Sequence, residues 1–169
     1  MPVGPHDDGD GCTGSDRQLM QTGYAIGGDD GCIADARHHA TAFLERVRAE
    51  RQASMTARVM DLTQLVVSEL VTNACKYAPG PVLMELRVTL ETVDVIVWDS
   101  DPTVPEAHAA DAGRVGQHGL EIVKAVAQDL RIQREPVGKR ITARIALSDT
   151  PANGATGSTG AAGINDITG

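Results

Sequence analysis

Apolar positions along the first half of the chain follow two different spacings. They recur at helical spacing over 33–50 and again from about residue 54 or 56 to 77, where a Pro-Gly pair at 79–80 ends the second segment. From residue 82 the period becomes two, because apolar and polar residues alternate in VLMELRVTL. This half of the pattern predicts two helices followed by a half-buried strand.

The second half of the pattern predicts one more helix and three more strands. After a tight turn at Glu91-Thr92, the predicted elements are a strand over 93–99, a polar loop over 100–117, a helix over 118–130, and strands over 131–135 and 140–148 joined by a turn at 136–139. Tight turns and one polar face per strand favour an antiparallel sheet. We therefore predict an α+β fold, a two-layer sandwich whose mixed, mostly antiparallel β-sheet is covered on one face by about three α-helices.

The two ends of the chain have a different composition from its middle. Residues 1–21 are rich in Gly, Asp and Pro, and residues 149–169 are low-complexity Gly, Ala and Thr. Such segments bury too little apolar surface to offset their ordering entropy, so both are predicted to be disordered tails. The prediction for 22–148 is a single folded domain. Neither a secretory signal nor an apolar run long enough to span a bilayer is apparent in the sequence, which favours a cytoplasmic protein without membrane contact.

Charge and cysteine content exclude several classes of function. With 15 Lys+Arg against 23 Asp+Glu, the formal net charge is −8, which argues against direct nucleic-acid binding because that requires a basic surface. Cys12, Cys32 and Cys75 are odd in number and widely spaced, so they predict neither a disulfide framework nor a zinc site. Cys75, in an apolar helix, is interpreted as a small core residue.

Three polar residues lie inside the apolar second helix, in the stretch ELVTNACKYAPG. On a helical wheel Glu69, Asn73 and Lys76 fall within an arc of about 60° along the border of the apolar stripe. Such an edge suits a partly enclosed pocket. Taken alone, the edge is better explained by Glu69 and Lys76 being solvated and Asn73 being incidental.

Two further features carry candidate chemistry. Asp99 ends an apolar strand in VIVWDSDP, where its carboxylate can accept a hydrogen bond beside the sheet or simply begin a turn. In GRVGQHGLEIV, Gly113, Gly116 and Gly119 precede a helix whose N-terminal amides could approach a phosphate. The glycines alone are a weak signal, since they match neither a P-loop nor a dinucleotide-binding fingerprint.

The order of these three features is more specific than any one of them. A helix with E-x-x-x-N, a strand ending in V-x-D and a GxxGL loop before a helix resemble the ATP-binding domain of the histidine-kinase/gyrase-type superfamily. Within it, LVVSELVTNACKYA is most similar to the stand-alone bacterial anti-sigma-factor serine/threonine kinases. The resemblance covers about residues 24–148.

The resemblance implies ATP and Mg²⁺ as cofactors and a role for each matching residue. Glu69 would be the general base for a serine hydroxyl or water, Asn73 would coordinate Mg²⁺ at the ATP phosphates, and Asp99 would receive the adenine amine. Further nucleotide contacts are implied for Lys76 and Tyr77 on the helix, for Arg114 as a γ-phosphate cation, and for Gly116, His118, Gly119 and Leu120 at the hinge of the ATP lid. A departure is Asp99-Ser100-Asp101-Pro102, where the family commonly has D-x-G-x-G.

Two functions follow as hypotheses from this resemblance. One is a protein serine kinase that phosphorylates an anti-anti-sigma antagonist and sequesters a sigma factor, with a homodimer as one option for its assembly. The alternative is a non-catalytic, nucleotide-dependent protein-binding module of the same fold, which the altered 99–102 segment favours. A histidine kinase is rejected, because fewer than forty residues precede His38 and His39 and a phosphoacceptor histidine needs a dimerisation hairpin upstream.

Overall fold

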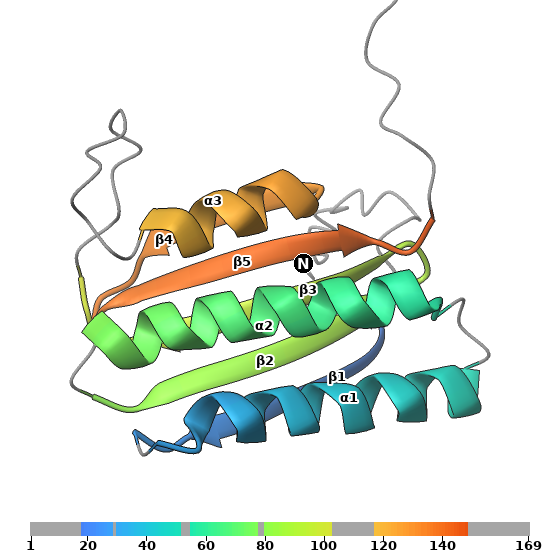
Figure 1. Cartoon of the computed structure of the whole chain (residues 1–169), viewed down its shortest axis with the longest axis horizontal. Coiled ribbons are helices and arrows are strands. Elements are labelled where there is room, and N and C mark those ends of the chain that lie inside the picture. The colour runs from blue at the N-terminus through green and yellow to red at the C-terminus, as the bar shows by residue number, and fades with distance from the viewer. Residues whose placement is uncertain (1–17, 29, 52–54, 78–79, 103–116, 149–169) are drawn as a thin grey trace, which may run out of the picture.

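The computed structural model describes residues 18–28, 30–51, 55–77, 80–102 and 117–148. In chain order the elements are β1 (Gln18–Ile26), α1 (Cys32–Arg51), α2 (Ala57–Tyr77), β2 (Val82–Thr89), β3 (Thr92–Asp99), α3 (Gln117–Val126), β4 (Asp129–Arg134) and β5 (Lys139–Ala146). Figure 1 shows the three helices stacked in one layer in front of the strands. The predicted α+β sandwich is confirmed.

The strands form one five-stranded sheet in the order β1-β2-β3-β5-β4. Each of the four pairings between the described strands is antiparallel, so within this part of the chain the sheet is antiparallel throughout rather than mixed. The chain crosses from β3 through α3 to the edge strand β4, and β5 then returns between them. Residues 40 apart, such as Asp99 and Lys139, thereby become direct neighbours on adjacent strands.

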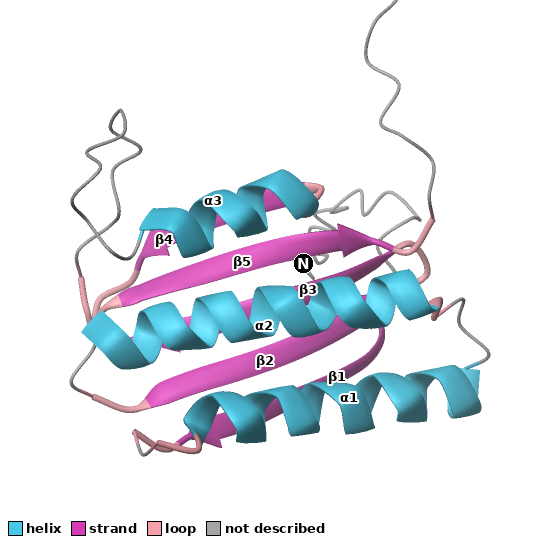
Figure 2. Ribbon diagram, viewed as in Figure 1, coloured by secondary structure: helices cyan, strands magenta, loops and turns pink. Residues whose placement is uncertain are grey.

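The helices cover one face of the sheet and enclose the core, as Figure 2 makes visible. α2 packs between α1 and α3 and lies over β2, β3 and β5. Alternate residues of the strands point toward it and are buried, while the predicted apolar stripe of α2 meets them from the other side. The buried residues of this stripe are Val59, Thr63, Val66, Val67, Leu70, Val71 and Ala74.

The strand β1 was missed by the sequence analysis. It starts at Gln18, inside the predicted N-terminal tail, and pairs along its length with β2. The signal was present, because Thr22, Tyr24 and Ile26 alternate with the exposed Gln21, Gly23 and Ala25. The Gly-rich sequence before residue 18 and the polar residues of the strand concealed it. The rest of that tail, and the whole tail at 149–169, lie outside the described residues.

Helix α3 is shorter than predicted. It ends at Val126 rather than residue 130, and β4 begins at Asp129. Leu130, interpreted as part of the apolar face of the helix, is instead a residue of β4 paired with Ala143. An apolar residue four positions after Val126 fits either element, so periodicity alone could not find this boundary. Likewise Lys139, predicted in a turn, is the first residue of β5.

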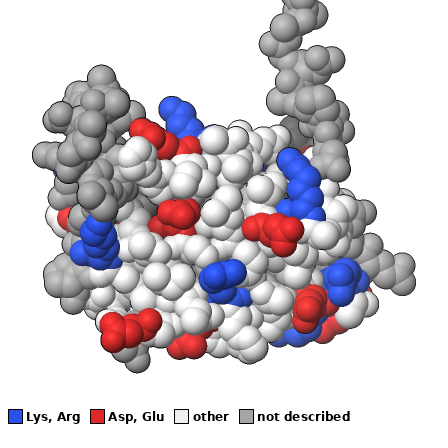
Figure 3. Space-filling view, in the orientation of Figure 1, with Lys and Arg blue, Asp and Glu red and all other residues white. Residues whose placement is uncertain are grey.

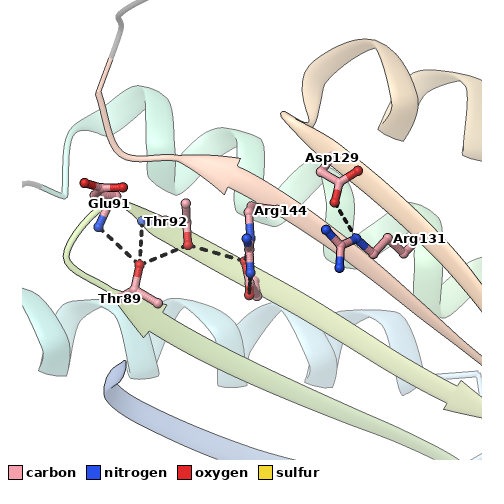
Figure 4. A network of polar contacts seen from close by, with 7 residues as sticks. Thr89, Glu91, Thr92, Asp129, Arg131 and Arg144 are labelled. Atoms are coloured by element: carbon pink, nitrogen blue, oxygen red, sulfur yellow. Dashed lines mark hydrogen bonds and ion pairs between the residues drawn. The ribbon is translucent and has the colours of Figure 1, made fainter. Parts of the chain in front are cut away.

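The face of the sheet opposite the helices carries polar and charged networks (Figure 4). Arg144 on β5 donates two hydrogen bonds to Asp94 on β3, both 2.9 Å long. At the β2–β3 turn, Thr89 Oγ1 accepts hydrogen bonds from the backbone N–H groups of Glu91 and Thr92. These contacts satisfy polar groups across the sheet and close the tight turn that the sequence predicts at Glu91-Thr92.

Among the described helices, none is both long enough and apolar enough to cross a bilayer.

Candidate functional site

Four element ends meet at one end of the molecule, on the left in Figure 1: the C-terminal half of α2, the end of β3, and the starts of α3 and β5. The antiparallel β3–β5 pairing places Asp99 and Lys139 there, and α2 packs on β3, β5 and α3. The predicted polar edge of α2, the strand-end aspartate and the glycine-containing start of α3 therefore share one region of the fold.

Glu69 lies directly against the first turn of α3. A Cβ atom built on Gly119 would be only 2.6 Å from Glu69 Oε2, so the carboxylate occupies the space that any side chain at position 119 would need. The first turn of a helix has amide N–H groups without intrahelical partners and a positive dipole end, which favour a nearby carboxylate. The glycine leaves room for the partly exposed Glu69 side chain against this turn.

We expect Gly119→Ala to displace the Glu69 carboxylate without destabilising the fold. Alanine is the better helix former by about 1 kcal/mol, and the atom that it meets is the far end of a flexible side chain, so the melting temperature should be unchanged or higher. The displaced carboxylate should reduce any turnover that uses Glu69 by about tenfold or more. Thermal unfolding and an ATP-turnover assay check this; a fully active variant would mean that the contact is incidental.

The other predicted residues of α2 follow Glu69 toward the end of the helix. Asn73 is one turn further on and partly exposed, and Lys76 is exposed. Tyr77 is the last residue of the helix, and its side chain lies outside the described atoms. Glu69 and Asn73 thus share an edge of the helix, four residues apart, as the wheel predicts.

Asp99 is buried and engaged in an ion pair. Lys139 Nζ lies 3.0 Å from Asp99 Oδ1, and the two side chains are only 2% and 1% exposed, respectively. The same ammonium group donates to the backbone oxygen of Asp101 at 3.2 Å and contacts its Oδ2 at 3.4 Å. The backbone N–H of Asp101 donates to Asp99 Oδ1 at 2.9 Å. Lys139 therefore holds two carboxylates and a carbonyl group at the end of β3.

This network defines what Asp99 can still do. A carboxylate has about four acceptor positions, and the Lys139 and Asp101 donors both use Oδ1. Neither of these two donors uses Oδ2, the oxygen that an adenine amine would have to reach. The buried negative charge is balanced by a buried positive one, so the aspartate is held in a fixed orientation.

Two glycines allow other chain segments to close around the end of β3. Gly138 has φ +83°, and a Cβ there would lie 1.8 Å from the Asp99 carbonyl oxygen, so no other residue fits without moving the β4–β5 turn. The N–H of Gly80 donates to Ser100 Oγ at 3.1 Å. The segment that departs from D-x-G-x-G thus has structural contacts of its own: Ser100 binds the start of the β2 segment, and Asp101 binds Lys139.

The predicted lid residues are only partly described. His118 is on the exposed side of α3, with Nδ1 3.5 Å from Glu121 Oε2 and both side chains well solvated. Leu120 packs against the core instead of facing solvent. Arg114, Gly113 and Gly116 lie outside the described residues.

Lys139 is the site residue that the sequence analysis missed. The predicted turn at 136–139 includes it, yet it lies an even number of residues from Ile141, Ala143 and Ile145, the inward-facing residues of β5. A lysine on the buried face of a predicted strand needs a partner, and a strand-end aspartate is a suitable one. This was the signal that could have identified it.

Comparison with known proteins agrees with this arrangement. Residues 32–145, well over half of the chain, match the family described as the histidine kinase-like ATPase domain. The chain belongs to this family. No curated protein matches it at a significant level. The match begins at the start of α1 and ends within β5, so it includes every element that contributes to the site, and the strand β1 lies before it.

As a histidine kinase-like ATPase domain, this chain has an ATP-binding fold. The resemblance also implies Mg²⁺, which would need a ligand among the residues of the site. The described residues contain no group of three or more His, Cys, Asp or Glu side chains that could hold a metal. Mg²⁺ prefers oxygen ligands and keeps several waters, so one amide oxygen together with phosphate oxygens can hold it. The partly exposed Asn73 is a suitable ligand of this kind.

Proposed function

We propose that this histidine kinase-like ATPase domain is a protein serine kinase that phosphorylates an anti-anti-sigma antagonist and sequesters a sigma factor. The observation that carries the proposal is the Glu69–Gly119 contact. A partly exposed carboxylate, supported by the first turn of α3 and one turn from Asn73, is suited to accept a proton from a protein hydroxyl beside a nucleotide.

The proposed reaction requires little covalent chemistry from the protein. Glu69 accepts the proton of the attacking serine hydroxyl while the terminal phosphoryl group passes from ATP to that oxygen, which leaves ADP. Asp99, fixed by Lys139, orients the adenine, and the first-turn amides of α3 and Lys76 lie on the phosphate side. When bound through Asn73, Mg²⁺ would neutralise charge on the phosphates.

The surface that would hold the protein partners is less sharply defined. Figure 3, viewed onto the helical layer, shows basic and acidic side chains interspersed rather than segregated. On α1, Arg37 donates to Gln64 of α2, and Arg46 lies 3.7 Å from Glu50. We expect partners to dock through shape complementarity and mixed polar contacts, because the described residues of this face form no uniformly positive or negative patch that would attract them.

Glu69→Gln is expected to abolish phosphotransfer and preserve nucleotide binding. The amide keeps the size of the side chain and cannot accept the proton, so transfer should fall by about 10²–10⁴-fold. The measurement is transfer of labelled phosphate from Mg-ATP to candidate antagonists, with nucleotide affinity by calorimetry on the same samples. Glu121→Gln, on the exposed side of α3, is the matched control and should transfer as the wild type does.

The same experiment distinguishes the second function, a nucleotide-dependent binding module without catalysis. The altered 99–102 segment favours it, since Asp101 stands where the family commonly has a glycine and is held by Lys139. If wild type binds ATP and partners without transferring phosphate to any of them, the kinase is ruled out. If Glu69→Gln then binds its partners in the same nucleotide-dependent way as the wild type, the result supports the non-catalytic binding module.

A further inference from the structure

Two cysteines that are distant in the sequence meet on the side of α2 that faces α1. Cys32 is the first residue of α1, and Cys75 lies in the last turn of α2, 43 residues later. Their Sγ atoms are 3.2 Å apart, and both residues are free thiols. The contact is independent of the nucleotide site, because the edge with Glu69 and Asn73 faces away from α1 on the helical wheel.

The surroundings of the two sulfur atoms differ. Cys32 is 7% exposed and belongs to the core, while Cys75 is only partly buried. A reagent from solvent therefore meets Cys75 first and finds Cys32 directly behind it. A disulfide has an S–S length of about 2.0 Å, so the sulfur atoms need to approach by only about 1 Å. Rotation of the two side chains, both near helix ends, can supply that movement.

We propose that Cys32 and Cys75 are a reversible thiol–disulfide site that exchanges with small disulfides of the glutathione type. The Cys75 thiolate attacks one sulfur of the small disulfide and releases the first small thiol. Cys32 then displaces the second small thiol from the mixed disulfide, forming the Cys32–Cys75 bond. The two protein thiols lose two electrons and two protons, and the small disulfide gains them as two thiols.

Exchange at this site is slow near neutral pH and its product is stable once formed. Burial, followed by the hydrogen bond and the charge of Cys32, raises the pKa of Cys75 to about 12, so the thiolate is scarce at pH 7. The bond would join the start of α1 to the end of α2 across a long loop and so restrict the unfolded chain. The oxidised protein should therefore melt about 10 °C higher than the reduced one.

The test uses the full chain with Cys12→Ser, so that the remaining cysteine cannot take part. Samples are equilibrated at pH 8.5 in defined mixtures of oxidised and reduced glutathione, quenched in acid, alkylated and digested. Mass spectrometry is expected to find one linked peptide pair that contains Cys32 and Cys75, and calorimetry to find the higher melting temperature. Dithiothreitol should reverse both.

Two controls make the result specific. Cys32→Ser and Cys75→Ser, which replace one sulfur by a smaller oxygen, should each lose the linked peptides and the change in melting temperature. The proposal is overturned if the parent protein gives only glutathione adducts or intermolecular dimers. It is equally overturned if the linked protein melts at the temperature of the reduced one. Neither outcome depends on nucleotide binding or phosphotransfer.

Discussion

Lys139→Met is expected to lower the free energy of unfolding by about 3–5 kcal/mol. The substitution removes the ammonium group and leaves the Asp99 carboxylate, 1% exposed, without its counter-ion. It also removes the donor to the Asp101 carbonyl oxygen. Methionine fits the volume of the lysine stem, so the loss comes from the uncompensated charge rather than from a cavity.

Urea unfolding followed by circular dichroism measures the effect. Lys124→Met, at an exposed position of α3, is the matched control and should change stability by less than about 0.5 kcal/mol. Adding Asp99→Asn to Lys139→Met removes the isolated charge and should restore part of the loss, whereas independent sites would give additive losses. Additive losses would mean that the ion pair does not connect β3 and β5 in solution.

Gly138→Ala should be almost as damaging, although it adds a single methyl group. The residue has φ +83°, which alanine rarely adopts, and the new Cβ would lie 1.8 Å from the Asp99 carbonyl oxygen. Because that neighbour is backbone, relief requires the β4–β5 turn to shift away from β3. We expect a loss of about 3–5 kcal/mol together with weaker nucleotide binding, since Asp99 would move as well.

Gly28→Ala provides the comparison for this substitution. A Cβ at Gly28 meets no atom within 4 Å, so its effect on the free energy of unfolding should stay within about 0.5 kcal/mol. Chemical denaturation of the two variants under the same conditions measures the difference. Equal stability of Gly138→Ala and Gly28→Ala would show that the turn accommodates the methyl group and that the close approach to β3 is not required.

Much of the fold was predictable because its core elements have strong periodicity. α2 and the strands β2, β3 and β5 alternate or repeat clearly, and most of their buried residues are those the patterns predict; an exception is Leu90, an apolar position of the predicted strand that is 59% exposed. β1 has a weaker pattern, since Thr22 stands where a larger apolar residue would mark a buried face. The end of α3 was misplaced because Leu130 suits a helix face and a strand equally well.

The site was predictable in its location and not in its contacts. The order of the motifs placed Glu69, Asn73, Asp99 and Gly119 in one region, which the packing of α2 on α3 and β3 agrees with. Hydrophobic periodicity predicts which face of an element a residue occupies. It does not predict which residue of another strand lies beside it. The Asp99–Lys139 pair depends on the β3–β5 register, and the local sequence indicates only that Lys139 lies on the buried face and needs a partner.

The strand order also determines when a nucleotide site can exist during synthesis. β5 is the last described strand to be made, yet it lies inside the sheet between β3 and β4. A nascent chain that has reached only residue 138 already contains Glu69, Asn73, Asp99 and Gly119. It lacks both the strand that pairs with β3 and the lysine that holds Asp99. The proposed nucleotide site is therefore incomplete on a growing chain, and at that site ligand binding would stabilise only molecules whose translation has passed β5.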